Sequence, residues 1–259
     1  MPLLTQFIFR LSFGLALAMA VTPARWVSSG YFRVHSYVLL GLNVLATLVA
    51  FSQPERYSLW PPLVAAVVSY LASVMWLYEK PRPGAMALAI VAAASIVGAW
   101  SAADPELHAS SADDFLAWTL WRLDPVTGGW LLGTTMAAML LGHWYLNTPG
   151  MQLAPLRRLV VLMAVAVAAR AALGAAGLAL AWFAGEPSAG VPETGHLVLL
   201  SLRWLAGLLG TLLLIVMTWQ TLKIPNTQAA TGMLYVAVIT TFLGELTAQL
   251  LSAESAYPV

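Results

Sequence analysis

A set of ionisable residues lies within, or at the ends of, runs that are apolar enough to span a lipid bilayer. The members of this set are Arg10, Arg33, His35, His143, Arg170, Arg203 and Glu245. A charge in hydrocarbon is costly, so such residues are by default candidates for ligand binding, proton transfer or ion pairing. The arginines suit an anion, and the histidines suit haem or quinone.

The arginine group is expected to gather at one depth in the membrane. At about 1.5 Å of rise per helical residue, Arg10 and Arg203 lie roughly 10 Å inside the outer ends of their runs, and Glu245 lies about 9 Å inside its own. We expect Arg203 and Glu245 to form an ion pair. Thr241, Glu245 and Gln249 recur at helical spacing, so this polar stripe should face protein or water.

Arg170 poses a different problem, because no acid is expected at its depth in any other helix. It lies about 18 Å from the inner end of its run. An excess of buried arginine over acid favours binding of a phosphate, carboxylate or propionate group, which guanidinium holds in a bidentate manner. The alternatives are that backbone carbonyls, water or Glu245 one or two turns away meet the charge of Arg170, or that it reaches into a wet crevice. The pair of Arg203 and Glu245 could in turn only fix helix packing.

The two intramembrane histidines are expected at matched depth, about 5–6 Å from the same membrane surface. A b-type haem held between two helices needs axial histidines at one level and arginines near its propionates. His35 and His143 would be the axial ligands, and Arg33, Arg157 or Arg158 would lie near the propionates. The alternatives are a quinone hydrogen bond from His143 and histidines that only bond to nearby carbonyls.

Composition sets the class of protein. The chain is 60% hydrophobic and only 9% charged, which is too apolar for a water-exposed surface. A net charge of +1 gives no case for nucleic-acid binding. The chain has no cysteine, which excludes disulfides, thiolate metal sites and iron–sulfur clusters. Asp104, Glu106 and His108 share a loop but lack the ligand spacing of a known site, so we predict no metal.

The elements that must position these residues are apolar runs of roughly 20 residues, the length of a transmembrane helix. We predict an all-α fold, a polytopic transmembrane bundle of about eight helices that forms a single integral membrane domain over 1–259. The predicted spans are 3–24, 32–52, 60–79, 84–102, 129–147, 159–184, 196–219 and 228–251.

A short amphipathic helix at 112–123 is predicted between the fourth and fifth spans. Ser111 and Asp114 approximate a helix-capping signal, and Trp118 and Trp121 would dip into the membrane interface. This helix would either seal the connection or cover an outward-facing cavity as a lid.

The basic residues favour one orientation. They gather in the connections after the first, third, fifth and seventh spans, and the positive-inside rule then puts both termini outside the cytoplasm. We expect a bacterial inner (plasma) membrane. Ala18-Met19-Ala20 also allows the first run to be a cleaved signal peptide, although a retained helix explains the charges more simply.

Three classes of function follow from these residues. The first is a membrane subunit of an electron-transfer complex that binds haem b or quinone, with redox or other membrane subunits as partners. The second is a transporter or flippase for an anionic solute or lipid. The third is a non-catalytic membrane scaffold or assembly factor. Motifs of hydrolases and nucleotide-binding enzymes are missing, so we assign no reaction. The first class leads because matched histidines are a more specific requirement than excess arginine.

Overall fold

Every described element of the chain is a helix, which confirms the all-α prediction for this part of the sequence. The computed structural model describes residues 2–54, 57–103, 115–148, 150–184, 193–224, 226–253, 255, 257 and 258. The helices are α1 (Pro2–Ala20), α2 (Ser29–Ser52), α3 (Trp60–Leu77), α4 (Pro81–Ser101), α6 (Phe115–Asn147), α7 (Ala154–Ala184), α8 (Glu193–Ser201), the π-helix η1 (Leu202–Gly210), α9 (Thr211–Lys223) and α10 (Thr227–Ser252).

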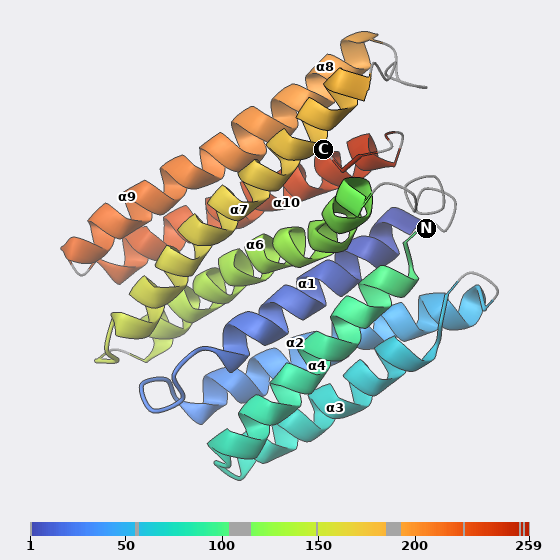
Figure 1. Cartoon of the computed structure of the whole chain (residues 1–259). Coiled ribbons are helices and arrows are strands. Elements are labelled where there is room, and N and C mark those ends of the chain that lie inside the picture. Colours follow the sequence, from blue (N-terminus) through green and yellow to red (C-terminus); the bar gives the residue numbers. More distant parts are fainter. Residues whose placement is uncertain are drawn as a thin grey trace.

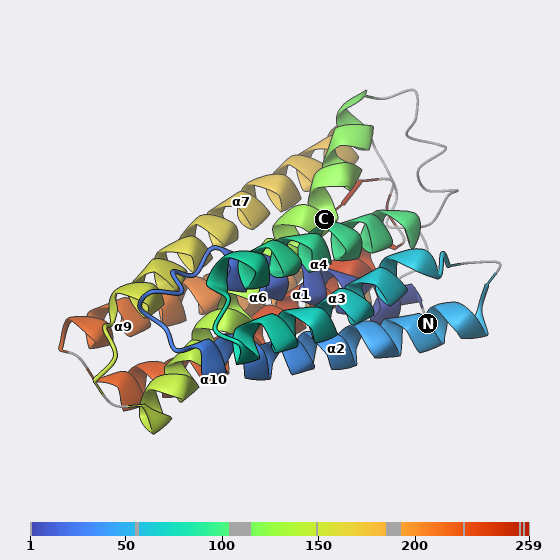
Figure 2. The same ribbon diagram turned by 90° about the horizontal axis from the view of Figure 1, so that it is seen from below.

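The helices pack side by side into one elongated bundle, with α1 and α6 at its centre (Figure 1). Helices α2, α3 and α4 pack on the α1 side, and α7 to α10 pack on the α6 side, as the view in Figure 2 also shows. Residues near both termini lie at the same end of the bundle. We call the opposite end, which holds the α1–α2 loop and the α3–α4 turn, the far end.

Seven helices among the described residues are long and apolar enough to cross a membrane. They carry large apolar side chains on their outer surfaces, for example Phe51, Leu205 and Ile239. In a membrane such side chains face lipid, because hydrocarbon is the solvent there. The chain is therefore a multi-pass membrane protein. Its membrane and its orientation stay predictions from the distribution of basic residues.

The predicted span at 129–147 belongs to α6, which is not among these seven helices. Neighbouring helices cover α6 on several sides, since it contacts α1, α4, α7 and α10. A helix surrounded by protein can carry more polar residues than one that faces lipid.

The predicted break between an interfacial helix at 112–123 and the span at 129–147 is wrong. Helix α6 runs without interruption from Phe115 to Asn147 and contains Pro125, while residues 112–114 lie outside the described part. Proline removes one backbone hydrogen bond from a helix and need not end it. The continuous helix has a large consequence, because it carries Asp124 into the bundle.

The predicted seventh span, 196–219, is built from α8, η1 and α9 in succession. The central nine residues are wound as a π-helix, a form that is rare and often found at functional sites. This segment contains Arg203.

Glycines let two pairs of helices approach at the level of their backbones. Gly14 of α1 lies against Gly129 and Gly133 of α6, where an added Cβ would overlap backbone atoms of the other helix. Gly207 of η1 and Gly244 of α10 form a similar contact. Such small-residue contacts are a main source of helix association in lipid, and both pairs flank the charged residues described next.

Candidate functional site

Five charged side chains from five helical segments form one chain of ion pairs inside the bundle. This charge cluster consists of Arg10 (α1), Asp124 (α6), Arg170 (α7), Arg203 (η1) and Glu245 (α10). It links the two central helices, α1 and α6, with the helical segments that pack on the α6 side.

Each ion pair of the cluster shares one residue with the next pair. Asp124 accepts hydrogen bonds from two arginines, with its Oδ2 2.5 Å from Arg10 Nη2 and its Oδ1 2.5 Å from Arg170 Nη1. Glu245 Oε1 also accepts two, 2.8 Å from Arg170 Nε and 3.0 Å from Arg203 Nη1. Arg170 therefore bridges the two carboxylates.

The cluster is buried and carries an excess of positive charge. No member has a side chain more than 7% exposed. Three guanidinium groups face two carboxylates, so one positive charge is uncompensated within the cluster. Burying an unpaired charge is costly, and such charges in membrane proteins usually mark ion or substrate paths.

Several polar atoms of the cluster have no hydrogen-bond partner among the described residues. These atoms are Arg10 Nε and Nη1, Arg170 Nη2, Arg203 Nε and Nη2, and Glu245 Oε2. Most of them are donors. Buried donors are normally satisfied, so a group of unsatisfied guanidinium nitrogens calls for an acceptor such as water or an anion.

Gly128 of α6 lies in close contact with these atoms. A Cβ at this position would lie 2.5 Å from Glu245 Oε2 and 3.3 Å from Arg10 Nη1. Any larger residue here would press directly on the cluster. The glycine therefore lets the charged groups of Arg10 and Glu245 lie directly against the backbone of α6.

The backbone explains how Arg203 reaches Glu245. Gly207, four residues after Arg203 in η1, meets Gly244 of α10, and an added Cβ on Gly207 would lie 2.5 Å from Gly244 Cα. This close approach brings the π-helical segment against α10 immediately beside Glu245. The ion pair expected between Arg203 and Glu245 is present in the structure.

Arg170 contacts Glu245, one of the partners considered for it, and also a carboxylate of another helix that the sequence prediction did not place at its depth. This second carboxylate is that of Asp124 in α6. Asp124 falls in the connection between the predicted interfacial helix at 112–123 and the predicted span at 129–147, so the sequence places it outside the membrane-spanning runs. Three intramembrane arginines with only one recognised acid were the available signal that a further buried carboxylate should exist.

The polar stripe on α10 faces protein as predicted. Thr241, Glu245 and Gln249 are all buried. Thr241 Oγ1 lies 3.2 Å from Thr211 Oγ1, and the two side-chain polar atoms of Gln249 have no partner among the described residues. The stripe thus continues the polar interior on both sides of Glu245.

The histidines lie apart from this cluster and have different neighbours. His35 is buried, its Nδ1 lies 2.7 Å from the Tyr31 carbonyl oxygen, and its ring lies 6.2 Å from that of Trp144. His143 is exposed, and its Nδ1 lies 3.2 Å from the hydroxyl of Tyr235 on α10. The two imidazole rings therefore differ in both exposure and hydrogen-bond partner.

Arg33 does not share the surroundings of His35. Residues two apart on a helix point to different sides, and Arg33 is only partly buried. No ion pair links it to another described side chain.

The metal candidates Asp104, Glu106 and His108 lie outside the described residues. Within the described ranges no group of three or more histidine, cysteine, aspartate or glutamate side chains could hold a metal ion.

Comparisons of the chain with known protein families, with curated proteins and with solved structures found no match.

Proposed function

We propose that the charge cluster binds a small anion, and that the protein is a membrane transporter for an anionic solute. The observation that carries this proposal is the buried excess of arginine: three guanidinium groups share two carboxylates and keep donor nitrogens without partners in the described structure. An anion would supply both the missing charge and the missing acceptors.

The geometry favours a compact ligand. All five side chains are almost completely buried, and Arg10, Arg170 and Glu245 pack closely against Gly128. A single carboxylate or a small oxyanion matches such surroundings better than a lipid molecule. A transporter for a small anion is therefore preferred over a flippase.

The two carboxylates have a role in this mechanism. Three unopposed arginines would hold an anion too tightly for release, and transport requires binding that is favourable on entry yet weak enough for exit. Asp124 and Glu245 already occupy part of each guanidinium group. The two carboxylates thereby lower the affinity of the arginines for an anion. They also hold the arginines in place when no anion is bound.

The charge balance can be tested with substitutions of Arg203. R203Q removes the excess positive charge, and we expect anion affinity to fall by about tenfold or more, because a hydrogen bond to a charged group contributes about 1.5–3 kcal/mol. R203K keeps the charge and should keep most binding. The measurement is the rise in melting temperature of the detergent-purified protein with sodium acetate, nitrate or phosphate at equal ionic strength, followed by uptake of the same radiolabelled anions into proteoliposomes.

The double variant R203Q/E245Q is the matched control, because it removes one charge of each sign and restores the original excess. Anion binding should return in part. A protein that remains folded and takes up none of these anions above protein-free vesicles would contradict the proposal. Equal binding by the wild type and R203Q would show that the cluster only fixes helix packing, which is the scaffold alternative.

A second candidate function is an electron-transfer subunit that binds a quinone or haem b at His35. The observation that favours it is the contact of His35 Nδ1 with the Tyr31 carbonyl. This contact fixes the proton on Nδ1 and leaves Nε2 as an acceptor or ligand, the arrangement usual for functional imidazoles.

The redox proposal predicts a visible signal from the purified protein. A dithionite-reduced minus oxidised spectrum should show a b-type α-band, or organic extraction should yield quinone, and H35A should lose either signal. H143A, which changes an exposed ring paired with Tyr235, is the comparison variant. A flat spectrum together with an extract free of quinone would eliminate this candidate.

A further inference from the structure

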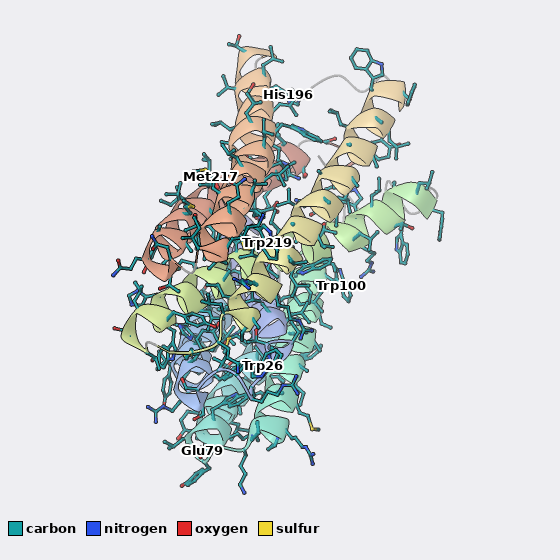
Figure 3. All side chains as sticks on the ribbon, turned by 90° about the vertical axis from the view of Figure 1, so that its left-hand side faces the viewer. Trp26, Glu79, Trp100, His196, Met217 and Trp219 are labelled. Atoms are coloured by element: carbon teal, nitrogen blue, oxygen red, sulfur yellow. The ribbon has the colours of Figure 1, made fainter. Side chains whose placement is uncertain are left out.

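A second basic site lies at the far end of the bundle, separate from the charge cluster. A cavity of about 440 Å³ opens where α1 ends and α4 begins, and Arg25, Arg82 and Arg158 line it. Arg10 and the end of α1 are separated by ten residues, which is about 15 Å along a helix. Figure 3 views the structure from this end, with Trp26 and Glu79 labelled in the half formed by α1 to α4.

Three different segments bring the arginines together. Arg25 lies in the α1–α2 loop, Arg82 in the first turn of α4, and Arg158 near the start of α7. All three are exposed, and none forms an ion pair with another described residue. No carboxylate is among the described residues that line the cavity. Charges of one sign in a recess attract an oppositely charged ligand.

The start of α4 adds to the positive potential. Pro81 and Arg82 of its first turn both border the cavity, and the N-terminal end of a helix carries a partial positive charge. Pro81 and Pro83 lack backbone N–H groups. The arginine side chains must therefore supply most of the hydrogen bonds to a ligand.

The wall of the cavity is apolar and firmly packed. Trp76 borders it and is 3% exposed. Its ring stacks on Phe32 at 4.1 Å between centroids and packs against Gly84, while its Nε1 has no partner among the described residues. Met19 and Val21 extend the apolar lining. The cavity thus combines cationic side chains with an apolar lining.

We propose that this cavity binds a phosphate-bearing anion at the membrane surface. Guanidinium groups pair with phosphate oxygens in a bidentate manner, and a cavity of this size falls within the range of small-molecule sites. Basic pockets between transmembrane helices are a recurrent way of holding anionic lipid headgroups. The same chemistry would accept the phosphodiester of an anionic phospholipid or a free phosphate.

The test is binding of three probes to the full-length protein in detergent. The probes are dioctanoyl phosphatidylglycerol, dioctanoyl phosphatidylcholine and inorganic phosphate, each followed by thermal stabilisation and by native mass spectrometry. We expect phosphatidylglycerol to bind more tightly than phosphatidylcholine, whose choline already neutralises the phosphate. The triple variant R25Q/R82Q/R158Q should bind it on the order of 100-fold more weakly, because each arginine near an anionic membrane surface contributes about fivefold.

The control is K223Q, which removes an exposed cation from the same end of the bundle without touching the cavity. It should leave binding unchanged. Stabilisation by phosphatidylglycerol alone identifies a lipid site, and stabilisation by inorganic phosphate identifies a soluble ligand. If a folded triple variant binds all three probes as the wild type does, the proposal is wrong. The outcome is independent of the charge cluster, because none of these substitutions changes that cluster.

Discussion

Replacing Asp124 with asparagine is expected to lower the free energy of unfolding by about 3–5 kcal/mol, the cost of leaving a buried charge without its partner. The carboxylate accepts hydrogen bonds from Arg10 and Arg170 at once. Arg170 would keep Glu245, but Arg10 has no other ion-pair partner among the described residues. The measurement is equilibrium unfolding of the purified variant in mixed detergent micelles, compared with the wild type.

Two further variants show whether charge is the cause. The double variant R10Q/D124N also removes the Arg10 guanidinium group, which D124N leaves without its partner. It should therefore recover part of the lost stability. E79Q neutralises an exposed acid in the α3–α4 turn and should change stability by less than about 0.5 kcal/mol. If D124N unfolds at the same detergent concentration as the wild type, Asp124 does not hold the cluster together.

The depth of a residue in the membrane could be predicted from the sequence, and this was enough to find most of the charge cluster. The pair Arg203–Glu245 follows from equal distances to the ends of two apolar runs, and it is present. Asp124 could not be placed in the same way. Its depth depends on where the helix begins, and the predicted span starts at 129 whereas α6 starts at Phe115.

Depth alone does not fix the direction in which a side chain points. His35 and His143 were expected at one level, yet the first contacts Tyr31 and the second contacts Tyr235. Neighbouring positions on a helix point about 100° apart, so Trp144 faces α2 while His143 faces α10. Which helices become neighbours is decided by packing, and no single-sequence pattern gives this directly.

The π-helical segment η1 is a further feature that the sequence does not reveal. Leu202–Gly210 reads as an ordinary apolar run. The π-helical segment contains Gly207, whose backbone contacts Gly244, and Arg203, whose side chain is hydrogen-bonded to Glu245. Both are tertiary contacts, and they override a weak local preference for the α-helix.

Replacing Gly133 with alanine is expected to destabilise the bundle by about 3 kcal/mol, at the upper end of the usual cost of overpacking. A Cβ at this position would overlap the backbone of Gly14 and Leu15, so α1 and α6 would have to move apart. The neighbouring Gly129 packs against the backbone of Arg10 in the same interface. Separation of these helices would therefore also strain the ion pair of Arg10 with Asp124, and unfolding in mixed micelles would measure the combined effect.

The matched controls are G41A and G232A, because both glycines are helical and neither has a neighbouring atom within 4 Å of an added Cβ. Alanine is favoured over glycine inside a helix by about 1 kcal/mol, so these variants should be as stable as the wild type or more stable. If G133A behaves like them, the α1–α6 contact is not tight. If it alone is destabilised, close packing of two backbones is what holds Arg10 against Asp124 across the centre of the bundle.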